Sequence, residues 1–287
     1  MKVNFFIVIV SILSMLISCD KKRDKVFSES PTVRLNSSVN NSYEILQGNQ
    51  AGWMIAYFPS NDLEFGGYTM FARFINNVEV VVEGDFTTKE AQTSTYIVSP
   101  GAGPILTFDT FNSIFHYFSL PGYFNRNASY QLPNFFSVGI GSTNEGMKGE
   151  YDFLLSKVSV DSIILNGRKS YNNLVMTPIL SSESATIVGS YREAVAKFHP
   201  FAGYNFEVGT ETIQASFINS LSKRALRVAG ANDIYAYRYT PAGLSFYKEY
   251  DLKGVKFKEL KYIDPVGAYT KGYFTNDAGT LKLVPTT

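Results

Sequence analysis

Residues 234–263 read IYAYRYTPAGLSFYKEYDLKGVKFKELKYI, and they carry a clear strand pattern. β-branched and aromatic side chains fill three runs within it, Ile234–Tyr239, Leu244–Tyr250 and Val255–Ile263. Short turns that contain proline or glycine separate the runs. This arrangement is typical of antiparallel strands joined by tight connections. We therefore expect a β-meander here.

The same pattern of short apolar runs separated by turn residues covers most of the chain and predicts a mainly β protein. Further strand candidates are residues 52–58, 68–75, 78–83, 94–98, 105–108, 135–140, 151–158, 162–166, 174–177, 204–208, 212–217, 223–228 and 280–284. Arg34–Gln47 and residues 181–198 have helical spacing instead. We expect antiparallel sheets that form two barrel-like or sandwich-like halves, residues 33–180 and 181–287, each preceded by an α-helix.

Three short segments add detail to this picture. Asn76-Asn77 and Asn166-Gly167 are predicted to be hairpin turns, because Asn and Gly tolerate the positive φ that tight hairpins need. Thr110–Phe118 (TFNSIFHYF) places Phe111, Phe115 and other apolar groups at helical spacing. We expect it to form one or two helical turns that plug the end of a barrel.

Charge and rare residues exclude several classes of protein. The 287 residues include 26 Lys and Arg against 25 Asp and Glu, a formal net charge of +1 that gives no electrostatic case for a nucleic-acid partner. One cysteine cannot staple a disulfide scaffold or build a Cys-rich zinc module. The fold must therefore depend on its apolar core.

The N-terminus indicates where the protein is located. Residues 5–18 (FFIVIVSILSMLIS) are uncharged and mostly apolar, and they fall short of the roughly 20 residues that span a bilayer. Leu16-Ile17-Ser18-Cys19 resembles the bacterial lipobox, whose cysteine is lipidated after cleavage. We expect a signal peptide over residues 1–18, a thioether lipid and an acyl chain such as palmitate on Cys19, and a flexible tether over residues 19–32.

Few residues suggest catalysis or metal binding. His116 and His199 are the two histidines, and neither lies in a zinc motif. We predict no catalytic residue, no metal and no cofactor. Asp109, Asn112 and His116 are instead expected to form a buried polar cluster that fixes the plug by hydrogen bonds. A relay of His116, Asp109 and a serine stays as the alternative.

Tyrosines are the candidate ligand contacts. Tyr235, Tyr237 and Tyr239 share one face of a predicted strand, because side chains alternate along a strand. Their rings could pack on sugars or peptides, and their hydroxyl groups could form hydrogen bonds with either. The alternative is a core or sheet face lined with tyrosine.

A set of motifs spread over the mature chain carries a family resemblance. The motifs are Phe27, Arg34-Leu35, Gly52-Trp53, Tyr57, Gly66-Gly67-Tyr68, Phe74, Gly103-Pro104-Ile105-Leu106, Phe108-Asp109-Thr110-Phe111-Asn112, His116-Tyr117-Phe118, Asp161-Ser162-Ile163-Ile164-Leu165, Gly167, Lys169, Met176-Thr177-Pro178, Tyr239-Thr240-Pro241, Gly243-Leu244 and Tyr247. Together they resemble an uncharacterised family of Bacteroidetes lipoproteins, a domain of unknown function. The resemblance implies an accessory of outer-membrane nutrient import systems, which pair a TonB-dependent transporter with a capture lipoprotein.

These observations predict a lipoprotein of the outer membrane, anchored by its lipid on a side that the sequence leaves open. We expect a non-enzymatic accessory that binds a glycan or peptide ligand and has outer-membrane import proteins as partners. Two alternatives stay open. One is a secreted hydrolase with an unrecognised site, and the other is a structural or adhesive surface protein.

Overall fold

The computed structural model describes residues 27–87, 91–120, 141–142 and 144–286. Strands make up 43% of the chain and helices 14%, in two antiparallel sheets of which one is a closed barrel and the other is nearly closed. The predicted fold class is therefore confirmed. In the part of the chain that the structure describes, no α-helix is long and apolar enough to cross a membrane.

The first sheet has nine strands in the order β4-β3-β2-β1-β9-β8-β7-β6-β5. Their bounds are β1 (Trp53–Tyr57), β2 (Tyr68–Phe74), β3 (Glu79–Gly84), β4 (Gln92–Thr95), β5 (Ile97–Pro100), β6 (Pro104–Thr107), β7 (Asp152–Val158), β8 (Ile163–Gly167) and β9 (Asn173–Pro178). The two edge strands, β4 and β5, are neighbours in the sequence with Tyr96 between them. One residue cannot bridge the edges of a flat nine-stranded sheet, so the sheet must curl until its edges meet.

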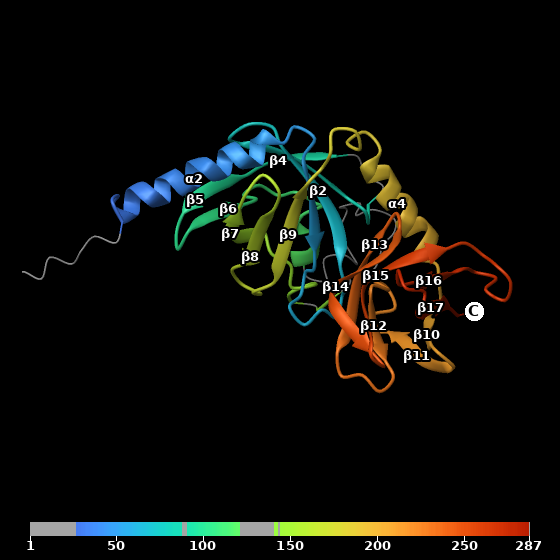
Figure 1. Cartoon of the computed structure of the whole chain (residues 1–287). Helices are drawn as coiled ribbons and strands as arrows, with labels where there is room; N and C mark the ends of the chain where they lie inside the picture. The colour runs from blue at the N-terminus through green and yellow to red at the C-terminus, as the bar shows by residue number, and fades with distance from the viewer. Residues whose placement is uncertain (1–26, 88–90, 121–140, 143, 287) are drawn as a thin grey trace, which may run out of the picture. The chain divides into compact units, whose positions relative to one another are not determined.

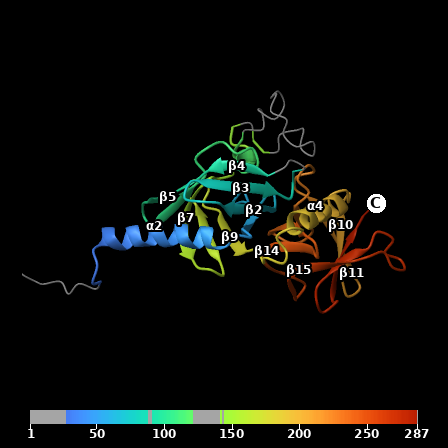
Figure 2. The same cartoon turned by 90° about the horizontal axis from the view of Figure 1, so that it is seen from above.

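Helix α2 (Pro31–Gly48) supplies contacts along this seam between β4 and β5. The Tyr43 hydroxyl accepts the backbone N–H of Val98 at 2.8 Å, and the Tyr43 ring packs against Tyr96 with centroids 5.8 Å apart. At the end of the helix, the Leu46 carbonyl accepts the indole N–H of Trp53 at 2.9 Å. The helix thus satisfies a backbone N–H of the edge strand β5, and it lies beside β5 in Figure 2.

The interior of the first sheet is aromatic. Alternate residues of β1 point inward, and Trp53, Ile55 and Tyr57 are all buried. The predicted plug enters this core through Phe115 and Phe118, and the segment ends in the short 3₁₀ helix η1 (His116–Ser119). Phe111 does not join them, because the residue is 56% exposed.

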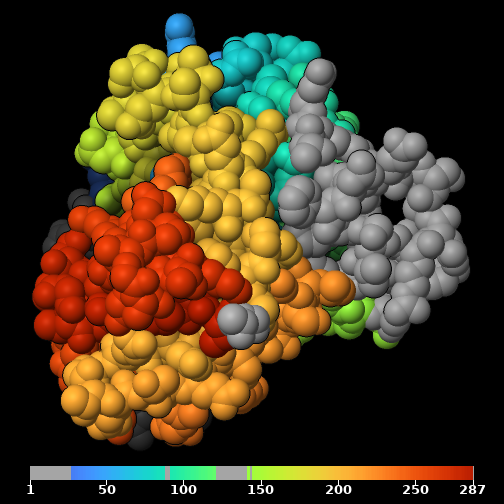
Figure 3. All heavy atoms as spheres, turned by 90° about the vertical axis from the view of Figure 1, so that its right-hand side faces the viewer, coloured from blue at the N-terminus to red at the C-terminus, as the bar shows by residue number. Residues whose placement is uncertain are grey.

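The second sheet is a closed eight-stranded barrel in meander order. Its strands are β10 (Tyr204–Val208), β11 (Glu211–Phe217), β12 (Ala225–Val228), β13 (Ile234–Thr240), β14 (Gly243–Leu252), β15 (Val255–Ile263), β16 (Tyr273–Thr275) and β17 (Leu281–Pro285). Pairing of β10 with β17 closes the ring, and helix α4 (Ile187–Phe198) precedes it (Figure 1). The face in Figure 3 shows α4 between the first sheet and the barrel.

A buried ion pair joins the barrel to the first sheet. Arg224 Nη1 donates to Asp85 Oδ2 at 2.9 Å and to the carbonyl oxygen of Gly67 at 2.8 Å, with both charged side chains 0% exposed. The guanidinium also lies over the rings of Tyr68 and Tyr239, at 4.2 Å and 4.8 Å from their centroids. Burial raises the pKa of Asp85, and the charge of Arg224 opposes that rise. This pair fixes the two sheets against each other.

At the same junction the backbones of the first sheet and the barrel approach each other closely, and this explains why residue 66 is a glycine. Gly66 has a φ of +68°, and a Cβ there would come within 2.0 Å of the Arg224 carbonyl oxygen. The next residue, Gly67, donates its N–H to the carbonyl of Tyr237 at 3.0 Å. A side chain at Gly66 would therefore push the barrel away from the first sheet.

Several local predictions were wrong. Residues 94–98 form two strands rather than one, because Tyr96 turns the chain from one sheet edge to the other. Asn166-Gly167 is not a turn: Asn166 pairs with Asn173 and the connection follows at residues 168–172. The helix predicted over residues 181–198 begins only at Ile187. The strand predicted at residues 135–140 lies outside the described residues.

Candidate functional site

The three candidate tyrosines lie inside the barrel. Tyr235, Tyr237 and Tyr239 do share one face of β13, but that face is the inner one, where they are 3%, 0% and 0% exposed. The hydroxyls of Tyr237 and Tyr239 both donate to the Lys223 carbonyl at 2.8 Å. Their polar groups are satisfied internally, so they do not form an exposed stripe for a ligand.

The polar segment Asp109, Asn112 and His116 divides between surface and core. Asn112 is 1% exposed, its side-chain oxygen accepts the backbone N–H groups of Ile114 and Phe115, and its amide donates to Ser94 Oγ at 3.2 Å. Asp109 is exposed, contrary to the predicted burial, and accepts the Thr95 hydroxyl. Both contacts tie the segment to β4.

His116 is held within this segment rather than in a relay. Its Nδ1 accepts the backbone N–H of Asn112 at 3.1 Å, while Asp109 bonds to Thr95. Burial lowers the pKa of the ring, with the Asn112 carbonyl and Asp152 opposing the change. The ring packs against Tyr151 at a centroid distance of 4.8 Å. Cys19, the predicted lipid attachment site, lies outside the described residues.

A hollow opens where the outer faces of the two sheets meet, and we name it the junction cleft. Its volume is about 250 Å³. The barrel contributes a polar wall, in which the strand register aligns Arg238 of β13 with Ser245 of β14 and Ser245 with Glu259 of β15. The Ser245 hydroxyl donates to Glu259 Oε1 at 2.8 Å. Three adjacent strands thus present a row of donor and acceptor groups.

The opposite wall of the junction cleft is mainly apolar. Met54 and Ala56 of β1 pair with Thr177 and Val175 of β9, and all four side chains line the cleft. Phe58 and Tyr247 contact each other edge to face at 4.9 Å, and both line the cleft as well. The cleft therefore offers an amphipathic ligand one apolar and one polar side.

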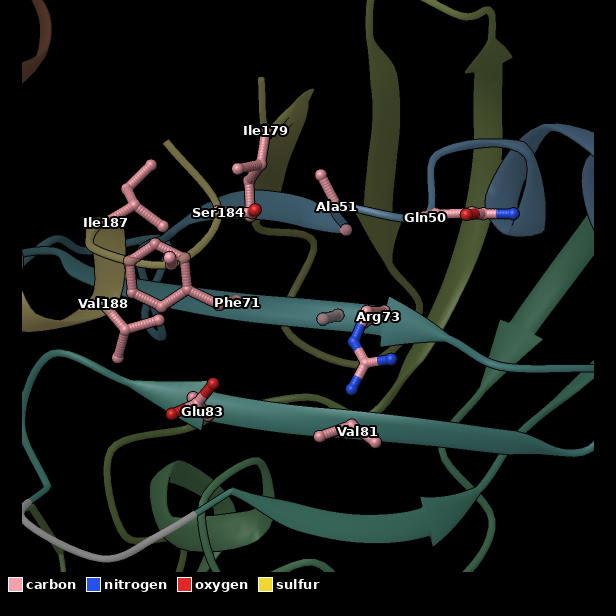
Figure 4. A pocket seen from close by; sticks show the side chains of 13 residues that line it. Gln50, Ala51, Phe71, Arg73, Val81, Glu83, Ile179, Ser184, Ile187 and Val188 are labelled. Atoms are coloured by element: carbon pink, nitrogen blue, oxygen red, sulfur yellow. The ribbon is translucent and has the colours of Figure 1, made fainter. Parts of the chain in front are cut away.

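A second hollow, the α4 pocket, opens on the same outer face of the first sheet. It has a volume of about 280 Å³ and is floored by β2. Figure 4 shows the Phe71 ring beside Ile187 and Val188, with the guanidinium of Arg73 further along β2 and Glu83 on β3. Glu83 pairs with Arg192 of α4 at 3.5 Å.

A third hollow lies beside the connection between β8 and β9, and a buried carboxylate shapes it. Glu150 is 4% exposed and accepts the backbone N–H groups of Arg168, Lys169 and Ser170. Burial raises the pKa of Glu150, and these hydrogen bonds oppose the rise. Glu150 and Tyr151 line this hollow, which has a volume of about 400 Å³. Since Glu150 is engaged by the backbone of this connection, we assign it a structural role.

Metal ligation is not indicated by the described part of the chain. No group of three or more His, Cys, Asp or Glu side chains there is placed to hold a metal ion. Glu259 at the junction cleft accepts the Ser245 hydroxyl, and Glu150 at the β8–β9 connection accepts backbone N–H groups.

A comparison with models of protein families finds a match over most of the chain. The model of the domain of unknown function DUF4302 matches residues 23–264. The chain belongs to the DUF4302 family. No curated protein and no solved structure matches it. The DUF4302 match ends at residue 264, before β16 and β17, although these two strands complete the barrel. The predicted resemblance to a domain of unknown function is therefore confirmed at the level of the family.

Sequence reasoning missed the junction cleft of this DUF4302 protein, although part of the signal was present. Arg238 alternates with the buried tyrosines of β13, so its outward direction could be predicted. Its alignment with Ser245 and Glu259 depends on the register of three strands. The apolar wall comes from β1 and β9, whose residues lie at least 61 positions before Arg238, and no local pattern indicates that pairing.

Proposed function

We propose that the protein is a lipid-anchored lipoprotein of the outer membrane that acts as a non-enzymatic binding accessory in nutrient capture. The ligand would be a glycan or a peptide, and outer-membrane import proteins of Bacteroidetes type would be its partners. The lipobox-like Leu16-Ile17-Ser18-Cys19 supports the anchor. The DUF4302 membership carries no assigned activity, so the ligand-binding part depends on the described geometry.

The observation that carries this proposal is the junction cleft. It lies between two β units, where binding sites are common, and it combines an apolar wall with a polar row of fixed side chains. The hydrogen bond between Ser245 and Glu259 and the bond from Arg238 to Thr69 hold that row in place through contacts within the protein. Such preorganisation lowers the entropic cost of binding.

The test uses the full chain expressed in a Gram-negative host and purified in mild detergent. Intact mass spectrometry should find residues 1–18 removed and a lipid on Cys19, and a Cys19→Ser variant should lack the lipid. The same preparation is then titrated with separate panels of glycans and peptides, and mass spectrometry follows every ligand that binds.

Binding without any change in ligand mass would support the proposal. Turnover would contradict the non-enzymatic part and favour the hydrolase. If no member of either panel binds, ligand capture is contradicted and a structural or adhesive role is favoured. An unlipidated Cys19 would overturn the anchor alone.

A further inference from the structure

We infer that the junction cleft binds a single carbohydrate ring, with Tyr247 packing against the ring and Arg238 and Glu259 bonding to its hydroxyl groups. This inference rests on the proposed function, because it names the ligand class and the contact residues of the same site. Four features of the described residues support it.

The first feature is that the cleft offers side chains and no free strand edge. Its walls come from β1 and β9 of the first sheet and from β13, β14 and β15 of the barrel. Each of these strands lies between two hydrogen-bonded neighbours. Extended peptides are commonly captured by adding a strand to an open edge, and that mode is closed here. A ligand recognised through its own side groups, such as a sugar, fits better.

The second feature is the unused hydrogen-bonding capacity of the polar row. Arg238 Nη1 donates to Thr69 Oγ1 at 3.1 Å and to the Tyr191 hydroxyl at 3.4 Å, which orients the guanidinium. A guanidinium has five N–H donors, and a carboxylate accepts about four hydrogen bonds. Glu259 uses one oxygen for Ser245. Sugar hydroxyls can each donate and accept, so they match the donor on β13 and the acceptor on β15, the two strands that flank β14.

The third feature is an aromatic side chain fixed at the edge of the cleft. Tyr247 is partly exposed, and its ring meets Phe58 at 67° with centroids 4.9 Å apart. The register between β14 and β15 shifts between Ser245 and Tyr250, so Tyr247 lies where the ladder is irregular. Such irregularities, β-bulges among them, often redirect a side chain near a functional site. A ring held in this way can pack against the C–H face of a sugar.

The fourth feature is size. About 250 Å³ is below the ~300–1,000 Å³ of pockets that enclose drug-sized ligands, so the cleft admits one ring rather than a long segment. The apolar wall of Met54, Ala56 and Val175 lies opposite the polar row. A sugar ring is likewise apolar on its C–H face and polar at its hydroxyls, so one orientation satisfies both walls.

The experiment compares the full chain in mild detergent with two cleft variants and one matched control. Glu259→Gln removes the charge of an exposed side chain, and Tyr247→Leu removes the flat ring but keeps apolar bulk. Glu83→Gln makes the same chemical change in the α4 pocket (Figure 4). The probes are tetrasaccharides of glucose, mannose, xylose, N-acetylglucosamine and galacturonic acid, and five tetrapeptides. Calorimetry measures the affinities, and thermal unfolding confirms that each variant is folded.

We expect at least one tetrasaccharide to bind and both cleft variants to weaken it about 10-fold or more, with Glu83→Gln within about 2-fold of the parent. Sugar binding that survives in both cleft variants would overturn this inference and leave the proposed function intact. Peptide binding that is lost in the cleft variants would overturn the carbohydrate assignment alone. If none of the sugars and peptides binds, both proposals are contradicted. Because Glu259 is exposed, its variant keeps the test valid even if Tyr247→Leu unfolds.

Discussion

The two β units close in different ways. The barrel closes by main-chain hydrogen bonds alone, with β10 paired to β17. The first sheet leaves β4 and β5 at its edges, and side chains of α2 bond and pack along the seam between them. In a closed ladder the backbone N–H and C=O groups of every strand are paired with neighbouring strands. In an open one, polar side chains must satisfy the unpaired backbone groups of the edge strands. All three hollows that we describe involve the outer face or loops of the unit with the incomplete ladder.

The largest effect is expected at the ion pair between the two units. Arg224→Met removes the cation and leaves the carboxylate of Asp85 buried without its partner. Breaking a fully buried ion pair in this way costs about 3–5 kcal/mol. We expect the free energy of unfolding, measured by urea titration, to fall by this amount.

The double variant Arg224→Met with Asp85→Leu sharpens the test. Replacing both partners with apolar groups removes the unpaired charge, so the double variant should regain most of the lost stability. As a control, Lys248→Met removes the cation of the exposed pair with Asp233 and should change stability by about 1 kcal/mol or less. Equal losses for the two single variants would contradict the role that we give to the buried pair.

The two β units should also differ in how their stability depends on pH, and we expect this effect to be smaller than that of the ion pair. Each unit contains one of the two histidines. Burial, with the nearby charges of Arg224 and Lys223, lowers the pKa of His199 from 6.5 to about 4. The unfolded chain therefore binds the proton more readily, and stability present above pH 6.5 is lost as the pH falls toward 4. The full shift corresponds to about 3 kcal/mol, and partial exposure of the ring reduces our expectation to about 1–2 kcal/mol.

His116 provides the internal comparison. Its pKa is also lowered by burial, but the Asn112 carbonyl and Asp152 favour its charged form. Nuclear magnetic resonance titration of the two imidazole signals should place the pKa of His199 below that of His116. His199→Gln should reduce the acid loss of stability more than His116→Gln does. The reverse order would contradict the combined effect of burial and nearby cations that we assign to His199.

The sequence predicted the β class, both helices and most strands, because these depend on local periodicity. In the barrel, β10 and β15 have the predicted bounds, and the alternation of β13 placed three tyrosines on one face. The sequence could not decide whether that face is inner or outer. Tyrosine suits both locations, and the answer depends on the Lys223 carbonyl, a partner outside the strand.

The failures have two physical causes: tertiary contacts that override a local signal, and elements or contacts for which no local signal exists. Asn166-Gly167 is a strong turn motif, yet Glu150 holds the next three backbone N–H groups and moves the connection along the chain. Strand β16 was missed because three residues carry too little pattern. The junction cleft combines two distant segments, so its residues could be predicted as outward-facing but not as neighbours.

The smallest expected effect compares one connection from each unit. Tyr171 follows β8 and Lys253 follows β14, and both have a left-handed backbone, with φ of 56° and 55°. For residues other than Gly and Asn, this left-handed conformation costs about 1–2 kcal/mol of conformational free energy. Tyr171→Asn and Lys253→Asn should each raise the free energy of unfolding in urea, by about 1 kcal/mol at most. Lys253 also pairs with Glu211 at 3.0 Å on the surface, so its gain should be the smaller. A loss of stability at Tyr171, a residue that is 75% exposed, would mean that its side chain stabilises the connection that Glu150 holds.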